Sequence, residues 1–151
     1  MKSVAMTTLA AFLALGLSPA YGDEAWIGQI KVVQGDAFVR RAGSLLPATI
    51  GERVQQSDTL ITGRDGALGV TFADDSLLSI GPDSTLDLVK FSFNATTWEG
   101  QFASRLEKGT LAAKSGRLVK QTPESMTVST PSAVRAVRGT EFVVRADGGQ
   151  P

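Results

Sequence analysis

Turn-forming residues recur at short intervals along this chain of 151 residues and divide it into short segments. They are Gly35-Asp36, Gly51-Glu52, Asp65-Gly66, Asp74-Asp75, Pro82-Asp83, Gly109 and Gly116. Several of the segments between them have the length of a strand, and such spacing is typical of an all-β domain. The sequence therefore predicts an all-β fold of many short strands, arranged as a sandwich, a barrel or a solenoid-like stack.

Alternation of apolar side chains supports this fold class. The clearest case is the segment from Ala67 to Phe72, in which Leu68, Val70 and Phe72 alternate with small residues. Successive side chains of a strand point to opposite faces, so the three large residues share one face. We expect that face to point into the core.

A change of phase marks the middle of the chain. Large apolar residues occupy even positions up to Leu88 and odd positions from Val89 onward, which predicts a bulge or bend between them. We expect the aromatic segment from Phe91 to Phe102 to form an edge or hairpin, because its rings need burial. The segment from Phe102 to Lys108 fits either a short helix or a strand.

The first residues have the pattern of a secretory signal. An apolar run from Val4 to Leu17 follows Lys2, and small residues stand at Ala20 and Gly22. We predict cleavage after Gly22, so that residues 1–22 form a signal peptide, residues 23–145 a β domain and residues 146–151 a disordered tail. The predicted location is the periplasm or the cell exterior, without stable insertion in a membrane.

Composition excludes several function classes. The chain has no Cys and no His, which removes the usual zinc ligands, Cys–His pairs and Ser-His-Asp hydrolysis. Its 15 basic and 15 acidic residues balance, which argues against nucleic acid as a partner. We expect no catalytic residue, no metal and no cofactor, and hence a protein that is not an enzyme.

The segment from Thr130 to Val144 predicts a strand, a break at Gly139 and a second strand. Pro131 disfavours a helix, and Gly139 can adopt positive φ at no steric cost. The order Thr130-Pro131, a short variable run and Gly139-Thr140-Glu141-Phe142 resembles the closing motif of the FecR domain family.

Earlier motifs extend the resemblance over residues 27–144. Gly51-Glu-Arg-Val is followed by Asp58-Thr-Leu-Ile-Thr62-Gly63, and Gly109 stands in a Leu-x-x-Gly-x-Leu element, all as in FecR-like domains. The matched positions, which we expect to be mainly structural, are Gly51, Asp58, Thr62, Gly63, Gly109, Thr130, Pro131, Gly139, Thr140 and Phe142.

The resemblance implies an exported β module that binds an envelope protein or a glycan. Signalling members resemble a cytoplasmic anti-sigma segment tethered through one membrane helix, and we expect this chain to lack both parts. The alternative is a structural or adhesion spacer of a cell-surface assembly, with the segment from Phe91 to Phe102 as an oligomer contact.

Three residues are candidate partner contacts: Arg135, Arg138 and Trp98. Arg135 and Arg138, with Arg145, fit either an anion clamp or exposed cross-strand partners of glutamates. Trp98 fits either a surface that stacks on a carbohydrate or ordinary packing.

The adjacent carboxylates Asp74 and Asp75 are the remaining candidates for chemistry, as a catalytic pair or part of a calcium site. Neighbouring side chains of a strand point to opposite sides, which is poor geometry for a pair acting together. We interpret them as part of a solvated turn.

Overall fold

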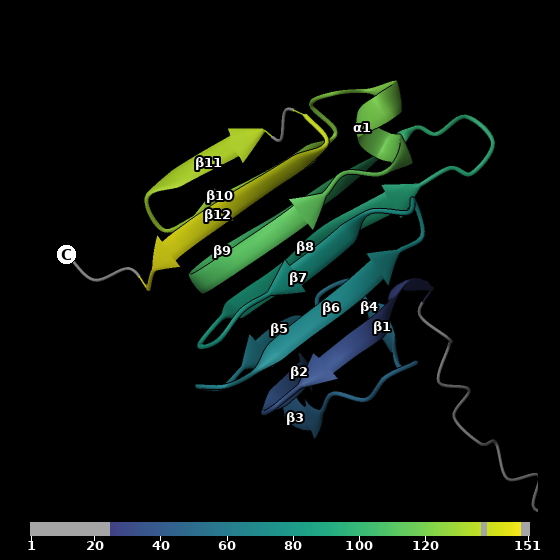
Figure 1. The fold of residues 1–151 in the computed structure, drawn as a ribbon. Coiled ribbons are helices and arrows are strands. Elements are labelled where there is room, and N and C mark those ends of the chain that lie inside the picture. The colour runs from purple at the N-terminus through teal and green to yellow at the C-terminus, as the bar shows by residue number, and fades with distance from the viewer. Residues whose placement is uncertain (1–24, 137–138, 149–151) are drawn as a thin grey trace, which may run out of the picture.

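The computed structural model describes residues 25–136 and 139–148, which form twelve strands and one short helix (Figure 1). In chain order the elements are β1 (Trp26–Gln34), β2 (Ala37–Arg41), β3 (Ser44–Pro47), β4 (Arg53–Gln55), β5 (Thr59–Thr62), β6 (Ala67–Phe72), β7 (Leu77–Ile80), β8 (Thr85–Phe93), β9 (Gly100–Lys114), α1 (Arg117–Gln121), β10 (Met126–Thr130), β11 (Ala133–Ala136) and β12 (Glu141–Asp147). The all-β prediction is confirmed.

One long strand, β9, belongs to both layers of the molecule. Along one edge it pairs first with β8, up to Lys108, and then with β7, from Leu111. Along its other edge it pairs with β10 and, from Lys108 onward, with β12. The sheet therefore curls around a core, with both layers joined at β9 (Figure 1).

We call the two layers the front sheet and the back sheet. The front sheet has the strand order β4-β1-β6-β7-β9-β12, and the back sheet has the order β3-β2-β5-β8-β9-β10-β11. Among the described strand pairs, only β9 with β10 is parallel. Of the predicted arrangements, the solenoid-like stack is therefore wrong, because it requires parallel stacking, and the curled antiparallel sheet is closer to a sandwich or half-barrel.

The predicted change of phase is a bulge in β8. The register of β8 against β9 shifts between Leu88 and Lys90, which leaves Val89 as the extra residue. Leu88 and Phe91 are both buried, whereas Val89 is exposed. The bulge thus keeps large side chains in the core on both sides of the slip.

Three phenylalanines from both layers form the centre of the core. The ring of Phe102 in β9 lies 4.6 Å from that of Phe72 in β6 and 5.1 Å from that of Phe91 in β8, both edge-on. The segment from Phe91 to Phe102 is a hairpin, as predicted. Its use as an oligomer contact is wrong for Phe91 and Phe102, since both rings are buried within one chain.

Helix α1, which we did not predict, is held by a buried carboxylate. Asp74 is fully buried, and it accepts hydrogen bonds from the Ser76 hydroxyl at 2.7 Å and the Leu118 N–H at 3.4 Å. Its backbone oxygen accepts from the Arg117 N–H at 2.8 Å. The interpretation of a solvated turn is therefore wrong for Asp74 and holds for the exposed Asp75 alone.

At the C-terminus the observed end of the β domain differs slightly from the predicted one. β12 continues to Asp147, so Ala146 and Asp147, which we assigned to the tail, belong to the sheet because Ala146 packs against the core. The predicted signal peptide and residues 149–151 lie outside the described residues. Within the described ranges, no helix has the length and hydropathy needed to cross a bilayer.

Candidate functional site

The family-motif position Asp58 is a buried anchor between strands. Its carboxylate accepts hydrogen bonds from Arg41 Nε at 2.9 Å and Nη2 at 2.6 Å, and from the Gln55 N–H at 2.9 Å. Arg41 ends β2 and Asp58 precedes β5, so this bidentate pair fixes the chain around β4. Asp58 is 1% exposed and is not available to a ligand.

Thr62 and Gly63 close the turns between the two layers. The Thr62 hydroxyl donates to the Gly81 oxygen at 2.6 Å and accepts from the Ser84 N–H at 3.0 Å. The Gly63 N–H donates to the Asp36 oxygen at 2.8 Å. Both motif positions therefore serve the fold.

The motif glycines occupy left-handed backbone positions. Gly51 has φ +89°, Gly109 +95° and Gly139 +99°, all in the region that favours glycine. At Gly109 there is a second reason, because a Cβ would stand 2.0 Å from the Ser84 hydroxyl oxygen. The positive φ that we expected Gly139 to accommodate is therefore confirmed.

The closing motif builds the edge of the front sheet. Thr130 ends β10, and its hydroxyl lies 3.4 Å from the Ala133 oxygen across the turn that contains Pro131. The Thr140 oxygen accepts from the Ser115 N–H at 2.8 Å, and half-buried Phe142 packs against the core. Thr140 and Phe142 therefore hold β12 against β9, whereas Thr130 and Pro131 belong to the β10–β11 turn.

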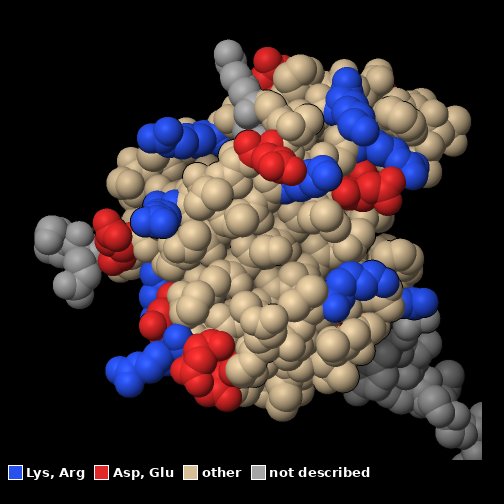
Figure 2. All heavy atoms as spheres, viewed as in Figure 1, with Lys and Arg blue, Asp and Glu red and all other residues tan. Residues whose placement is uncertain are grey.

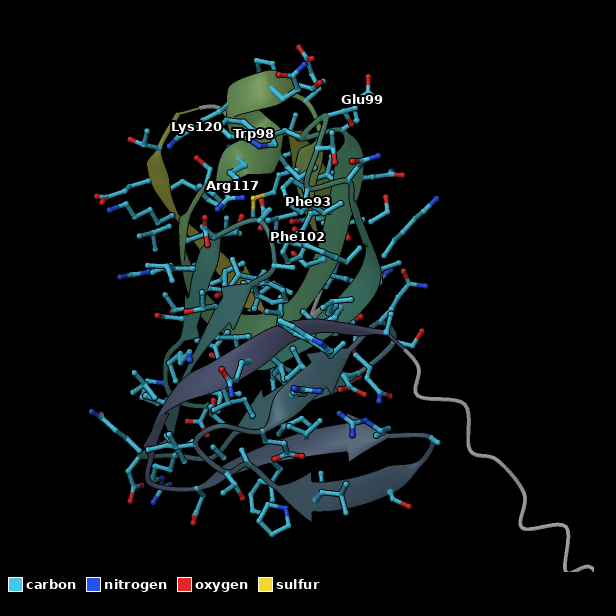
Figure 3. All side chains as sticks on the ribbon, turned by 90° about the vertical axis from the view of Figure 1, so that its right-hand side faces the viewer. Phe93, Trp98, Glu99, Phe102, Arg117 and Lys120 are labelled. Atoms are coloured by element: carbon cyan, nitrogen blue, oxygen red, sulfur yellow. The ribbon has the colours of Figure 1, made fainter. Side chains whose placement is uncertain are left out.

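The candidate contact Trp98 packs against its own chain. It lies at the tip of the β8–β9 hairpin, where the Arg117 guanidinium stands 5.7 Å from the ring centroid (Figure 3). Arg117 also pairs with Asp75 at 2.7 Å. The Arg117 side chain of α1 thus lies over one face of the indole, which favours packing over carbohydrate stacking for this residue.

The two described arginines of the predicted clamp line one hollow. Arg135 on β11 and Arg145 on β12 border it together with Thr130 and Ser132. Arg135 lies opposite buried Val128 and hence on the inward side of β11, beside the free edge of β12. Arg138 lies outside the described residues. Trp98 is not among the residues that line this hollow, so Arg135 and Trp98 do not share a site.

The outward side of the front sheet carries a different feature, a row of small and apolar side chains across five strands. Cross-strand register places Val32, Gly69, Ser79, Ala112 and Val143 side by side in this order. We call this row, with its neighbour Leu77, the apolar face. Figure 2 shows a broad uncharged area across the middle of this side of the molecule, with charged side chains gathered around it.

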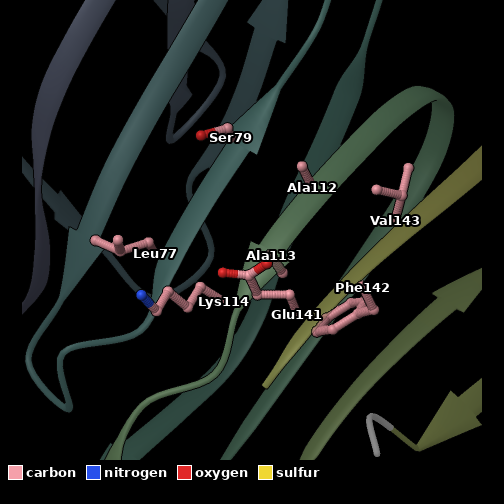
Figure 4. A pocket seen from close by; sticks show the side chains of 8 residues that line it. All are labelled: Leu77, Ser79, Ala112, Ala113, Lys114, Glu141, Phe142 and Val143. Atoms are coloured by element: carbon pink, nitrogen blue, oxygen red, sulfur yellow. The ribbon is translucent and has the colours of Figure 1, made fainter. Parts of the chain in front are cut away.

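The apolar face has a shallow hollow over its smallest residues. The hollow measures about 380 Å³ and is bordered by Leu77, Lys114, Glu141 and Val143, with Ser79 and Ala112 below (Figure 4). Leu77 is 42% exposed and Val143 is 62% exposed. An apolar side chain of a partner protein can enter this hollow, where it would contact the small residues below and the exposed apolar side chains beside it.

Sequence reasoning missed the apolar face. The residues that form it stand on five strands between positions 32 and 143, and only their register brings them into line. The available signal was the run of small residues at alternate positions of β6, which we assigned correctly to one face without asking what covers it. Over the described ranges, no group of three or more metal-ligating side chains is present.

Comparison with known proteins gives one family. The family described as FecR protein matches residues 58–151. No curated protein matches the chain. A solved structure described as "Cell surface anchoring domain" is 26% identical, with a TM-score of 0.40, and the match covers 42% of this chain and 84% of that chain.

Proposed function

The chain belongs to the FecR protein family, and from this membership we propose that it is a non-enzymatic binding module of the bacterial envelope. Its apolar face contacts an envelope protein. The predicted signal peptide supports a location in the periplasm or at the cell surface.

The observation that carries the proposal is the exposure of the apolar face. Val32, Leu77 and Val143 are 46%, 42% and 62% exposed on one side of the front sheet. Exposed apolar side chains that gather on one flat surface, ringed by charges, are typical of protein contact sites. A protein partner suits this face better than a glycan, because the row holds no aromatic ring on which a sugar could stack.

The polar residues of the chain support a non-enzymatic role. The carboxylates that sequence reasoning considered for chemistry are engaged in the fold, since Asp74 anchors α1 and Asp75 pairs with Arg117. The family-motif positions described above are likewise turns and anchors. Binding through shape and apolar contact needs none of them.

Site-specific photo-cross-linking tests the proposal. A benzophenone amino acid placed at Leu77 should yield a cross-linked envelope protein when the chain is expressed in cells and irradiated. The matched control carries the same group at Val89, which is 50% exposed on the back sheet. The Leu77→Asp substitution should abolish binding of the partner that the cross-link identifies.

Cross-links of equal yield from both positions would contradict the assignment of the face. A cross-linked glycan from Leu77 in place of a protein would contradict the class of partner. Unchanged binding by Leu77→Asp would show that the partner contacts another surface.

A further inference from the structure

The free edge of β12 offers unpaired backbone groups for a second contact. Among the described strands, β12 pairs with β9 alone. The bond from the Ser115 N–H to the Thr140 oxygen sets the alternation, so that Phe142 and Val144 direct their backbone groups to β9. Glu141, Val143 and Arg145 therefore direct their N–H and C=O groups to the free edge.

The side chains along this edge are complementary to those of a second copy of the same edge in antiparallel orientation. We infer that two copies of the chain associate through antiparallel pairing of their β12 strands about Val143. In this register Glu141 stands opposite Arg145 of the partner subunit, and Arg145 stands opposite Glu141 of the partner subunit. Glu141 and Arg145 carry both free backbone groups and the matching charges, so hydrogen-bond phase and charge select the same register.

The inward side of the edge also suits a second β12 strand. In the register about Val143, Phe142 and Val144 of one copy oppose Val144 and Phe142 of the other, so apolar side chains meet across the edge. The hollow beside β12, of about 210 Å³ and lined in part by Ser132 and Arg135, gives these inward side chains room. The stem of Arg135 can cover them while its guanidinium stays in water.

The other terminal strands of the two sheets are less suited to pairing. β3 and β11 have four residues and β4 has three, whereas β12 has seven. β3 also ends at Pro47, which has no N–H to donate. Length and the charge pattern thus single out β12.

Dimerisation does not rest on the proposed partner contact and can be tested without a partner. If it occurs, Val143 of both copies meet at the centre, and the two apolar faces join into one continuous surface. The cross-linking experiment above and the measurements below can fail independently of each other.

The inference can be tested by measuring the dimer dissociation constant by sedimentation over a concentration series, for the wild type and for variants in which the charges of Glu141 and Arg145 are reversed. We expect the wild type to be a monomer–dimer equilibrium. Glu141→Arg or Arg145→Glu alone places like charges opposite each other at two symmetric positions, which should raise the dissociation constant roughly tenfold. The double variant should restore the wild-type constant, because the pairs are exchanged.

A backbone variant provides the second test. Val143→Pro removes an N–H that points away from β9, so the chain should fold, as circular dichroism checks, and sediment as a monomer. Lys90→Glu, on an exposed position of the back sheet, is the charge control and should leave the dimer unchanged. A wild type that stays monomeric at every concentration, or a dimer insensitive to both single charge variants, would overturn the inference.

Discussion

The turns on either side of β7 are built from the same two side chains in the same order. In both Asp75-Ser76 and Asp83-Ser84, the aspartate has positive φ (67° and 50°) and the serine is fully buried. Each serine hydroxyl oxygen accepts an N–H from the β9 region, from Gly116 at 3.1 Å and from Thr110 at 3.0 Å. The buried hydroxyls thus satisfy backbone groups that the sheet leaves unpaired.

Two glycines allow backbone strain and crowding to be separated. Gly109→Ala should lower the free energy of unfolding by about 3 kcal/mol or more, because a left-handed backbone and a Cβ at 2.0 Å from Ser84 Oγ act together. Gly139→Ala is the matched control, since its φ is similar but no atom lies within 4 Å of the added Cβ. We expect about 1 kcal/mol there. Urea unfolding measures both, and equal losses would contradict the role of Ser84.

The buried pair of Arg41 and Asp58 gives a second prediction. Asp58→Ala leaves the guanidinium and the Gln55 N–H without this acceptor, and we expect a loss of about 3 kcal/mol in the free energy of unfolding. The control is Glu107→Ala, which removes the ion pair between Arg105 and Glu107. The side chains of this pair are 48% and 38% exposed, respectively. A loss of about 0.5 kcal/mol is expected for that exposed pair. Similar losses from both variants would show that burial adds nothing.

At the scale of elements, local sequence patterns predicted strands well. They predicted poorly those features that depend on contacts between residues far apart in the sequence. β6 begins and ends at the predicted residues, and the bulge at Val89 lies where the apolar phase changes. Helix α1 escaped prediction because its anchor, Asp74, is 44 residues from Leu118 along the chain. β9 runs through Gly109, which we took for a turn, since the reason for glycine there is Ser84 of a neighbouring segment.

The candidate site was less predictable than the fold, because it depends on contacts between residues far apart in the sequence. The motif positions were recognised, and the structure gives them turn and anchor roles. The apolar face depends on the relative register of five strands, which no local period encodes. Trp98, proposed as a ring that stacks on a carbohydrate, instead contacts Arg117 of α1, and only the tertiary structure creates this contact.

The anchoring of α1 by Asp74 can be tested by hydrogen exchange. Asp74→Ala leaves the Leu118 N–H and the Ser76 N–H and hydroxyl without their acceptor. We expect faster exchange at residues 117–122 and a loss of about 2 kcal/mol in the free energy of unfolding. Asp75→Ala should change exchange much less, because the Asp75 carboxylate is exposed. Equal effects of the two variants would refute the anchor.

At the scale of the whole molecule, the two sheets share both a strand and the phenylalanine cluster. Phe72 belongs to the front sheet, Phe91 to the back sheet and Phe102 to β9, which is common to both. Neither sheet can separate from β9 without exposing part of this cluster. The layers should therefore unfold as one cooperative unit.

The two tryptophans allow this cooperativity to be measured. Trp26 lies on β1 of the front sheet and Trp98 lies on the β8–β9 hairpin. In the single-tryptophan variants Trp26→Phe and Trp98→Phe, the fluorescence transition in urea should coincide with the transition of the same variant in far-ultraviolet circular dichroism. Two separate midpoints in either variant would mean that the layers unfold independently.

The place of β9 in the chain also governs the order of events during biosynthesis. Eight strands leave the ribosome before it, and β7 and β8 lack their neighbour in the closed structure until residues 100–114 have followed. Such distant pairings slow folding and leave strand edges open to association with other chains. A nascent chain halted before residue 100 should thus require a holding chaperone, whereas one released beyond residue 147 should close by itself.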